Sequence, residues 1–596
     1  MCGIVGYVGK GDVLKALLKG LEALEYRGYD SAGVAVHTGA DLVVEKRAGR
    51  LSALKEALRE HPLSGRCGVG HTRWATHGAA TDDNAHPFAS DHNRFVVVHN
   101  GIITNYLPLK RELTQRGIAL RSDTDSEVIA HLIDLSYTGD VLDAIRLAVR
   151  KLEGSFALGI LDVFEPSTLY GAKKDSPLLI GRGHEESYIC SDISGFPENC
   201  TEVAYVDDNV LVQLTEESAK AYDLDRTPLP LNFLGNECGR QMGGDTGCRM
   251  LYEIHEVPAA LEKTLRAYPE EAVARILREE HDEICLLGCG SAYHAGLVCK
   301  AAMREIAGVR VTDYVASEFL TERYVGGTHP LFIAISQSGE TADTLQAVKR
   351  AKRYGATVLA VTNVQTSSLV RLADEAVLTQ CGTERAVAAT KSYSAQVIAL
   401  LRICLQYADI YDKIKKNDMA RFLAELYALP SKAAAVIEGE ESLAASSARL
   451  AAANALFCLG KGADYAAAKE GSLKVKEVSY LFSEAYPSGE LKHGTLALME
   501  QGVYALFVAT DPHLAAKNAS SVAEVACRGA STYAIANETI ADSLGADETF
   551  PLPDTLPAFS PVLSTVALQI IAYYVGMCRG CDVDRPRNLA KSVTVE

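Results

Sequence analysis

The sequence predicts a multidomain α/β protein, with an α+β N-terminal half followed by two tandem doubly wound α/β subdomains. Three observations support this prediction. Residues 1–238 contain short alternating apolar runs, residues beyond about 239 alternate long helical patterns with short buried strands, and a glycine-containing turn recurs within the second half. The chain has 596 residues, whereas single hydrophobic cores stop growing at roughly 250–300 residues.

The N-terminal half combines period-two apolar runs with fewer helical patterns. Gly, Asn and Asp break the runs into short strand candidates, and helical candidates cover residues 13–24 and 127–135. Short alternating strands with covering helices indicate layered antiparallel sheets. The strand candidates are residues 4–8, 32–36, 42–45, 95–98, 156–161 and 210–214.

The second half has a different texture. Residues 236–247 (NECGRQMGGDTG) are polar and Gly-rich, which is typical of a linker. We therefore predict a linker over residues 239–269, between the two halves. Beyond it, short apolar strands alternate with long helical patterns, an arrangement typical of parallel doubly wound sheets. The strand candidates are residues 284–287, 331–335, 357–361, 455–459 and 503–508.

An internal repeat divides this second half. A strand, a GxG turn and a helix start occur twice, 172 residues apart, since position 288 recurs at 460. Four matches at one offset predict a duplicated α/β unit, with subdomains over residues 270–415 and 445–585 and a short tail over 586–596. The matching pairs are Gly288 and Gly460, Gly290 and Gly462, Tyr293 and Tyr465, and Ala295 and Ala467.

Composition and charge narrow the class of protein. A net charge of −17 argues against nucleic acid or an anionic membrane as a main partner. The apolar stretch 562–577 contains Gln569 and is shorter than the roughly 18 residues of a membrane span, so it predicts a buried helix. The N-terminus has no secretory pattern and the 15 cysteines are scattered, which predicts a cytoplasmic protein with free thiols.

Cys2 is the first candidate for chemistry. If Met1 is removed, Cys2 carries a free α-amine with a pKa of roughly 8, which can serve as a base for the adjacent thiol. A cysteine after an initiator Met more often has no such meaning. Four further motifs in the same half favour the catalytic interpretation: EYRGYDSAG at 25–33, HTRWATHG at 71–78, HNGII at 99–103 and SDTDSE at 122–127.

In this order and spacing the motifs resemble the class II glutamine amidotransferase domain over essentially the whole half. The resemblance implies an N-terminal-nucleophile fold, in which antiparallel sheets are stacked between helices, with Cys2 as the nucleophile. Attack on a carboxamide creates an oxyanion that needs two donors. Asn100 offers a side-chain N–H and Gly101 a backbone N–H, although Asn-Gly alone is equally a hairpin turn.

Free glutamine needs partners for its carboxylate and its ammonium. Arg73 suits the carboxylate through a bidentate fork, and Asp125 suits the ammonium, with Asp123 as a rival on composition alone. The resemblance implies that Thr76 and His77 assist. Trp74 is the single tryptophan; core packing would explain it, but the resemblance implies a gate on an ammonia passage.

Two loops in the second half indicate a phosphate-binding site. GCGSAYHAG at 288–296 and SQSGETADT at 336–344 each follow a predicted strand and precede a helix, so backbone N–H groups and hydroxyls converge there. A dinucleotide site is the rival, but the first loop is GxGxxY and no Walker lysine is present. The predicted ligands of a sugar phosphate are Ser291, Ser336, Gln337, Ser338 and Thr341.

The second repeat has Val508-Ala509-Thr510-Asp511 where the first has SQSG, so one phosphate site per chain is expected. The loops resemble the sugar isomerase domain, here in tandem. With the segments 470–494 and 582–596, the resemblance covers nearly the whole chain and narrows to the glutamine–fructose-6-phosphate aminotransferase family. It implies glutamine and fructose 6-phosphate as substrates, no metal or other cofactor, and a homodimer or larger homo-oligomer.

The resemblance also implies catalytic residues for the sugar half of the reaction. Glu477 would move a proton, and His493 would open the sugar ring. Lys591 would form a Schiff base with the ketone of the sugar, and Lys474 would lie nearby. Taken singly, Lys474 and Glu477 form an ordinary i,i+3 pair, His493 suits a core, and Lys591 suits solvent.

Two departures from the family pattern, Ala389 and Thr495, bear on the choice of sugar. One alternative is therefore an amidotransferase acting on another ketose phosphate. A second alternative, from a different class and independent of these departures, is a catalytically inactive regulator that binds sugar phosphates.

Overall fold

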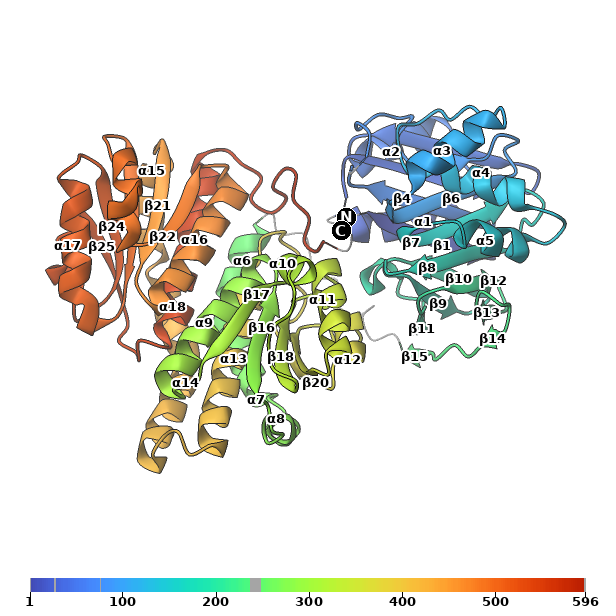
Figure 1. Cartoon of the computed structure of the whole chain (residues 1–596). Coiled ribbons are helices and arrows are strands. Elements are labelled where there is room, and N and C mark those ends of the chain that lie inside the picture. The colour runs from blue at the N-terminus through green and yellow to red at the C-terminus, as the bar shows by residue number, and fades with distance from the viewer. Residues whose placement is uncertain (1, 26–27, 76, 236–247, 594–596) are drawn as a thin grey trace. The chain divides into compact units, whose positions relative to one another are not determined.

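The computed structural model describes the whole chain except residues 1, 26–27, 76, 236–247 and 594–596. The chain divides into two compact units (Figure 1). One contains residues 1–245 with residues 592–596, and the other contains residues 246–591. We call them the N-terminal unit and the C-terminal unit.

Two antiparallel sheets form the centre of the N-terminal unit. The eight-stranded sheet has the order β15 (Leu234–Gly235), β11 (Glu202–Tyr205), β9 (Leu179–Gly183), β10 (Glu186–Cys190), β1 (Gly3–Gly9), β4 (Cys67–Arg73), β2 (Ser31–His37), β3 (Leu42–Ala48). The seven-stranded sheet has the order β14 (Pro228–Leu229), β13 (Ala219–Tyr222), β12 (Val210–Leu214), β8 (Leu169–Lys174), β7 (Gly154–Asp162), β6 (Phe95–Ile103), β5 (Phe88–Ala89).

Helices cover the outer faces of these sheets, so the unit has four layers. Ile4, Val69 and Val98 belong to the apolar core between the sheets. The helix α1 (Val13–Leu24) and α2 (Leu51–Glu60) pack on the eight-stranded sheet. On the seven-stranded sheet lie α4 (Glu127–Ser136) and α5 (Val141–Val149), with α3 (Tyr106–Gln115) beside them. This layering confirms the predicted sandwich, and α1 has the bounds that its periodicity predicts.

The C-terminal unit contains two five-stranded parallel sheets. The first has the order β17 (Val311–Val315), β16 (Glu283–Gly288), β18 (Pro330–Ile335), β19 (Thr357–Thr362), β20 (Glu375–Leu378). The second has the order β22 (Ser483–Pro487), β21 (Ala455–Gly460), β23 (Val503–Ala509), β24 (Ser531–Asn537), β25 (Glu548–Leu552). The two strand orders are equivalent, as the internal repeat predicts.

Helices cover both faces of each parallel sheet. In the first sheet, α9 (Gly290–Ile306) and α13 (Lys391–Ile410) cover one face, and α10 (Ala316–Thr321), α11 (Ala342–Arg353) and α12 (Ser368–Leu372) cover the other. In the second sheet, α16 (Ala463–Ser479) and α18 (Ser560–Cys578) face α17 (Ala515–Ala526) across the strands. The same unit also contains α8 (Glu270–Leu277), α14 (Lys416–Glu438) and α15 (Glu440–Leu450).

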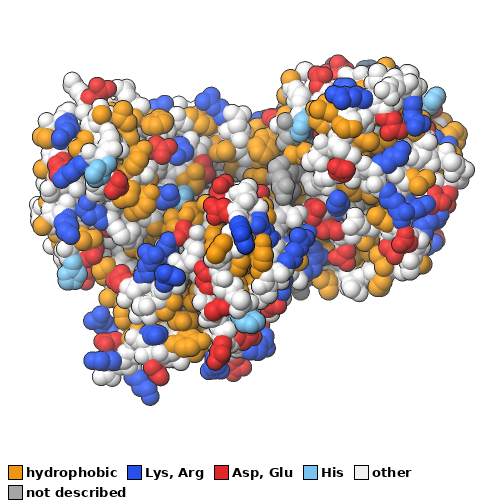
Figure 2. Space-filling view, in the orientation of Figure 1, with side chains coloured by type: hydrophobic (Ala, Val, Ile, Leu, Met, Phe, Trp, Pro, Cys, Tyr) orange, Lys and Arg blue, Asp and Glu red, His pale blue; other side chains and the backbone are white. Residues whose placement is uncertain are grey.

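The helix α18 is the predicted buried helix. By length and composition it could cross a membrane, but 83% of its most apolar window is buried inside the unit. It packs against α16 and α15. Figure 2 shows acidic and basic side chains intermixed over the visible face, so the excess of acidic residues does not form one patch there.

The predicted linker over residues 239–269 is wrong for its second part. Residues 236–247 lie outside the described part of the chain, but α6 (Arg249–His255) and α7 (Val257–Arg266) follow and are helical. Met250, Ile254 and Leu261 are buried in the core of the C-terminal unit. Met250, Ile254 and Leu261 have the three-to-four-residue or seven-residue spacing of a buried helix face. The prediction gave more weight to the Gly-rich composition of the preceding segment.

Each parallel sheet has a topological switch point, where the chain leaves neighbouring strands in opposite directions. In the first sheet it lies between β16 and β18, and in the second between β21 and β23. Ligands of open parallel sheets bind at this position, at the carboxyl ends of the strands. The two predicted phosphate loops follow β16 and β18, so both meet at the first switch point.

Candidate active sites

Cys2 lies against the backbone of Trp74. It directly precedes β1, and the antiparallel pairing of β1 with β4 sets Gly3 opposite Thr72. This register brings the Trp74 N–H to the Cys2 Sγ atom, at 3.3 Å. Burial raises the pKa of the Cys2 thiol, while the nearby Arg73 guanidinium acts in the opposite direction. The candidate nucleophile is thus held in place by a backbone donor from the HTRWATHG motif.

Asn100 approaches Cys2 from the other sheet. Its side-chain Nδ2 donates to the Cys2 carbonyl oxygen at 2.9 Å, and the residue is buried. Gly101 follows with a φ of 137°, and a Cβ atom there would lie 2.0 Å from the Ser155 carbonyl oxygen. Only glycine fits that backbone position. The predicted oxyanion donor Asn100 therefore lies beside the candidate nucleophile, and Gly101 follows it directly on β6.

Arg73 is buried, and its guanidinium is wrapped by the loop that follows β4. It donates to the carbonyl oxygens of His77, of Gly78 at 3.2 Å and of Ala79 at 3.3 Å. The His77 ring packs edge-on against Tyr106. Thr76, predicted to assist in glutamine binding, lies outside the described residues.

Asp125 is buried at the same site. Its Oδ2 accepts from the backbone N–H of Ile103 at 2.8 Å, and its Oδ1 accepts from the Ser126 hydroxyl at 3.3 Å. Its negative charge acts on both Cys2 and Arg73. The structure thus brings together Cys2, Arg73, Trp74, Asn100 and Asp125, which the sequence separates by up to 123 positions.

The predicted phosphate loop of the C-terminal unit is tightly organised between β18 and α11. The Ser336 hydroxyl contacts the Thr341 hydroxyl at 3.0 Å and accepts from the Gly339 N–H at 3.1 Å. The Gln337 carbonyl accepts from the Asn363 N–H at 3.0 Å, and the Ser338 hydroxyl accepts from the Glu340 N–H at 3.1 Å. These bonds fix the loop at the N-terminus of α11. Free backbone N–H groups at a helix N-terminus are favourable partners for an anion.

Ser291, the predicted ligand on the other loop, belongs to a buried polar network between α9 and α16. Its hydroxyl donates to Glu470 at 2.8 Å and accepts from the Lys474 Nζ atom at 3.1 Å. Lys474 also donates to Glu477 at 2.5 Å, and His294 Nδ1 lies 2.8 Å from Glu470. The network connects one repeat to the other at the first switch point.

Ion pairing keeps Lys474 and Glu470 of this network ionised although both are buried. Burial by itself lowers the pKa of Lys474, but Glu477 and Glu470 outweigh it and raise that pKa above its ordinary value. Burial likewise opposes ionisation of Glu470, yet Lys474 and His294 outweigh it and lower the pKa of the carboxyl. The side chain of Glu477 remains 19% exposed. Lys474 therefore positions Glu477, which is the member of the pair that still reaches open space.

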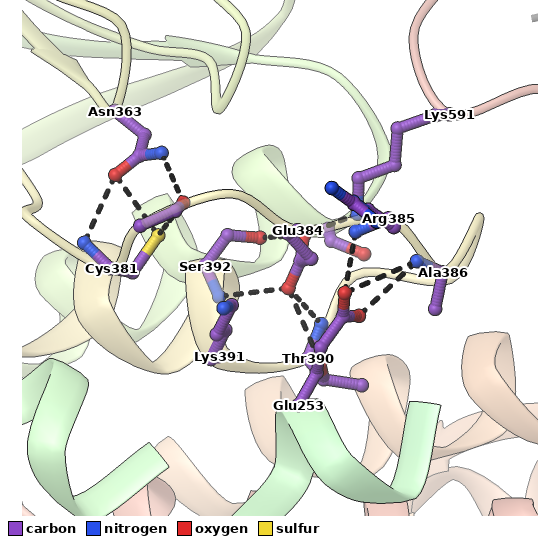
Figure 3. Close-up of polar contacts among 12 residues, drawn as sticks. Glu253, Asn363, Cys381, Glu384, Arg385, Ala386, Thr390, Lys391, Ser392 and Lys591 are labelled. Atoms are coloured by element: carbon purple, nitrogen blue, oxygen red, sulfur yellow. Dashed lines mark hydrogen bonds and ion pairs between the residues drawn. The ribbon is translucent and has the colours of Figure 1, made fainter. Parts of the chain in front are cut away.

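Lys591 forms a second buried pair, with Glu384 (Figure 3). The Lys591 ammonium contacts the Glu384 carboxylate, and their side chains are 6% and 0% exposed. Glu384 also accepts from the Ser392 hydroxyl at 2.6 Å and from the Thr390 N–H at 3.0 Å, at the start of α13. Burial opposes its ionisation, but Lys591 outweighs burial and lowers the pKa of the carboxyl.

The loop that carries Glu384 is held by α6, part of the segment predicted to be a linker. Glu253 on α6 accepts from the backbone N–H groups of Arg385 and Ala386 (Figure 3). Burial and the neighbouring Glu384 raise the pKa of Glu253. Asp584, two residues before the tail begins, accepts from the Met250 N–H at 2.8 Å. The helix α6 therefore joins the Glu384 loop to the segment that leads into the tail with Lys591.

His493 is the predicted site residue that lies apart. It ends the short 3-10 helix η4 (Glu490–His493) and is exposed. Among the described residues, no hydrogen bond or ion pair connects its imidazole with Glu477 or Lys591. Its predicted role in ring opening therefore rests on the motif alone.

Comparisons with known proteins cover the same two units. The glutamine amidotransferase domain family matches residues 71–197, and the SIS domain family matches residues 276–403 and 449–574. Glutamine–fructose-6-phosphate aminotransferases (isomerizing) from Clostridium tetani and Caldanaerobacter subterraneus subsp. tengcongensis are 41% and 42% identical to this chain. Each alignment covers 100% of both chains.

The chain belongs to the glutamine–fructose-6-phosphate aminotransferase family. A solved structure agrees: the C-terminal domain of glucosamine-fructose-6-phosphate aminotransferase from Francisella tularensis matches with a TM-score of 0.55 and 32% identity. The match covers 58% of this chain and 99% of that one. The family resemblance and the fold class predicted from the sequence are confirmed.

Three buried or partly buried residues that contact the predicted site residues or their partners were missed in the sequence: Glu384, Glu470 and His294. Glu470 lies four residues before Lys474 and seven before Glu477, so helical spacing alone could have placed it on the same face. Glu384 had no such local indication. Its partner Lys591 is 207 positions away, and only the packing of the tail against α13 reveals the pair.

The second switch point of this family member is filled by its own side chains. Asp464 accepts from the Thr510 N–H at 2.8 Å and from the Thr510 hydroxyl at 2.5 Å, and that hydroxyl also contacts Ser560. Thr510 is the counterpart of Ser338 at the 172-residue offset, and Asp464 is the counterpart of Ala292. A buried carboxylate in the second repeat thus takes the position that an alanine takes in the first. Burial raises the pKa of Asp464 to about 6.

Asp464 gives a pH dependence to the stability of the C-terminal unit. Its pKa is about 6 when folded and 3.8 in the reference state, so the folded state keeps a proton that the unfolded state releases as pH rises. The contribution of Asp464 is complete below pH 3.8 and is lost by pH 6. The loss is on the order of 2–3 kcal/mol. Glu253, whose pKa burial raises to about 7, adds to the pH dependence in the same window. We therefore expect Asp464→Asn to make the slope shallower without abolishing it, measured as unfolding midpoints of the C-terminal unit between pH 4 and 7.

Thr510→Val provides the matched comparison. It removes the hydroxyl that stabilises the ionised carboxylate, so the pH window should extend upward instead of vanishing. Parallel stability curves for the unaltered protein and Asp464→Asn would show that Asp464 does not titrate in this window.

Proposed function

We propose that this protein hydrolyses glutamine at Cys2 and transfers the released ammonia to fructose 6-phosphate, giving glutamate and glucosamine 6-phosphate. One observation carries the proposal. A single chain holds a cysteine beside the Asn100 amide in one unit, and buried lysine–carboxylate pairs with a Ser/Thr-rich loop at a helix N-terminus in the other. Full-length relatives that are named for this reaction support it.

The glutamine half uses the N-terminal unit. The Cys2 thiolate adds to the glutamine side-chain carbonyl, and Asn100 and Gly101 stabilise the oxyanion. The Cys2 α-amine takes the thiol proton and passes it to the leaving nitrogen, so ammonia leaves as the γ-glutamyl thioester forms. Water then releases glutamate and restores the thiol. Asp125 and Arg73 suit the ammonium and carboxylate of the substrate, with Thr76 and His77 in support. The buried position of Asp125 gives such a contact its strength.

The sugar half uses the C-terminal unit. The loop from Ser336 to Thr341, with Ser291 nearby, is proposed to bind the phosphate group at the first switch point. His493 opens the ring, and the Lys591 amine condenses with the C2 ketone and releases water. Ammonia then displaces Lys591, leaving an imine at C2.

Glu477 completes the isomerisation. Its carboxylate removes a proton from C1 of the imine, giving an enolamine, and returns the proton to C2, which leaves an aldehyde at C1 and an amine at C2. Lys474 supports this role because it holds the Glu477 carboxylate at 2.5 Å and remains charged. A partly exposed carboxylate beside a fixed cation is able both to take up and to return a proton.

The remaining features of the proposal come from the sequence. We expect a cytoplasmic enzyme that assembles as a homodimer or larger homo-oligomer. We propose the domain boundaries 1–238, 270–415 and 445–585, with a catalytic tail over 586–596. The fourteen described cysteines are free thiols, which agrees with a reducing compartment. Light scattering of the purified protein would test the assembly, and a monomer would contradict it.

The first test of the proposed function is product analysis. Incubation with glutamine and fructose 6-phosphate should yield glucosamine 6-phosphate and glutamate in a one-to-one ratio. Cys2→Ala should abolish glutamate formation, because no thioester forms, but should retain synthesis from high external ammonia. Cys527→Ala, at an exposed cysteine, is the control and should retain both activities. A Cys2→Ala protein that still hydrolyses glutamine would refute the nucleophile.

Glu384→Gln should impair the sugar half alone. The Lys591 ammonium loses a buried charge-assisted partner, an interaction of about 1.5–3 kcal/mol, so synthesis should fall roughly 10- to 150-fold from either nitrogen source. Glutamine hydrolysis without sugar should persist. The control is Glu425→Gln on α14, which removes the carboxylate of another partly buried lysine pair and should have little effect. Equal losses in both variants would contradict a specific role for Glu384.

Trp74→Ala should uncouple the two half-reactions. Trp74 contacts the nucleophile through its backbone, and its side chain is proposed to close a passage for ammonia. Glutamate should therefore still form while less glucosamine 6-phosphate is made per glutamate. Trp74→Phe keeps an aromatic ring and should restore much of the ratio. One-to-one stoichiometry in Trp74→Ala would show that the residue is ordinary packing.

A further inference from the structure

Three buried histidines lie behind the Asn100 side chain and have no part in the mechanism above. His71 on β4, His86 and His99 on β6 are each exposed by 3% or less. The His71 and His86 rings stack with centroids 4.0 Å apart and planes 10° from parallel, and His86 lies 6.4 Å from His99. Three imidazoles withdrawn from water in one place need a physical reason.

The contacts of His71 determine its protonation. Its Nε2 atom lies 3.0 Å from the His99 carbonyl oxygen and 3.0 Å from the Asn100 Oδ1 atom. Both oxygens can only accept, so Nε2 carries the proton. Burial lowers the pKa of His71 to about 3, which leaves the ring neutral near pH 7. The Nδ1 atom of His71 is buried without a partner among the described residues.

This tautomer fixes the orientation of the Asn100 amide. The Asn100 Oδ1 atom must face the His71 N–H, so Nδ2 must face Cys2, where it donates to the carbonyl oxygen at 2.9 Å. A rotated amide would set NH₂ against the His71 N–H and Oδ1 against the Cys2 carbonyl, losing both bonds. One of the two Nδ2 hydrogens serves Cys2, and the other remains for the oxyanion of a substrate.

The same network reaches Asp125. The backbone N–H of His99 donates to His86 Nδ1 at 3.2 Å, so His86 Nδ1 is unprotonated. His99 Nδ1 lies 2.8 Å from the Ser126 hydroxyl, which donates to Asp125 at 3.3 Å. Because the hydroxyl gives its proton to Asp125, it accepts from His99. Neutral imidazoles thus support the proposed oxyanion donor at one end and the proposed ammonium ligand at the other.

We propose that His71 is a positioning residue for glutamine hydrolysis: as a neutral Nε2–H imidazole it holds the Asn100 amide in the orientation that receives the oxyanion. The inference rests on the proposed function of Cys2 and Asn100. A corresponding role follows for Ser126, which holds the Asp125 carboxylate for the substrate ammonium. His71 acts through Asn100, since its Nε2 contacts are with Asn100 and His99 and not with Cys2.

The test compares two substitutions at position 71. His71→Leu removes the donor, whereas His71→Gln supplies an amide N–H at a similar reach. Loss of one oxyanion donor lowers kcat by roughly 100- to 1,000-fold, and a misoriented donor should lower it less. We expect His71→Leu to lower the kcat of glutamine hydrolysis about 10- to 100-fold with KM changed less than about threefold. His71→Gln should recover at least about tenfold of that loss.

Two controls separate positioning from folding. His37 is also a buried histidine of the same sheet, and its Nε2 bonds a backbone carbonyl, that of Val163, at 2.8 Å. His37→Gln should therefore leave kcat unchanged. Each variant is also assayed for synthesis from external ammonia, which reports an intact C-terminal unit. Ser126→Ala should raise KM for glutamine severalfold while kcat stays within about twofold.

The outcomes distinguish the possible failures. If the unaltered protein does not hydrolyse glutamine, the proposed function itself is wrong. If it does and His71→Leu keeps its kcat, or His71→Gln is no better than His71→Leu, the positioning role is overturned. Loss of the acid limb of the kcat–pH profile in His71→Gln would instead identify His71 as a general base. If His71→Leu does not fold, His71→Gln against His37→Gln and Ser126→Ala still decide the question.

Discussion

The chemistry of this protein depends on one constraint: a polar group withdrawn from water must have a partner in fixed geometry. Glu384 and Lys591 illustrate it most strongly. The carboxylate is fully enclosed and is held at once by an ammonium, by hydroxyls and by the first turn of α13. Removing one member of such a pair leaves a buried charge, which costs about 3–5 kcal/mol. A lysine near the chain end is thereby fixed in a buried site instead of moving in solvent.

The two units meet this constraint in different ways. In the N-terminal unit the supporting groups are neutral, because burial lowers the pKa values of His71 and His86 and their tautomers are set by carbonyl and amide partners. In the C-terminal unit the supporting groups are charged, because Lys474 lies between Glu470 and Glu477. Neutral donors suit an oxyanion that appears only during reaction, whereas paired charges suit the transfer of protons on a sugar.

The duplicated subdomains share one backbone arrangement but differ in the side chains at their switch points. Both switch points lie between the first and third strands of their sheets, and both are followed by helices whose N-termini favour an anion. In the first repeat the loop from Ser336 to Thr341 is shaped by its own hydroxyls. In the second, Asp464 supplies a carboxylate to Thr510. A small residue at position 292 and an acidic one at 464 are the side-chain difference behind the proposal of one phosphate site per chain.

The sequence by itself determined the layers and the repeat, and it predicted candidate reactive residues for both units. Apolar periodicity reports which face of a local segment is buried, so α1, β16 and β23 could be predicted within about a residue. The motifs around Cys2, Arg73 and Asn100 identified the first site because their residue types are unusual together. The Gly-rich segment led to the prediction of a linker that also included α6 and α7. These helices are short, so few apolar residues mark their buried faces.

Only the tertiary structure decided which partner each reactive group has. Lys591 meets Glu384 across 207 positions, Asn100 meets His71 across 29, and Ser291 meets Glu470 across 179. Hydrogen bonds and ion pairs of this kind are set by the packing of distant elements, and no local period encodes them. Periodicity therefore predicted where a side chain is buried, whereas the fold decided what it contacts there, and that contact sets its charge and its orientation.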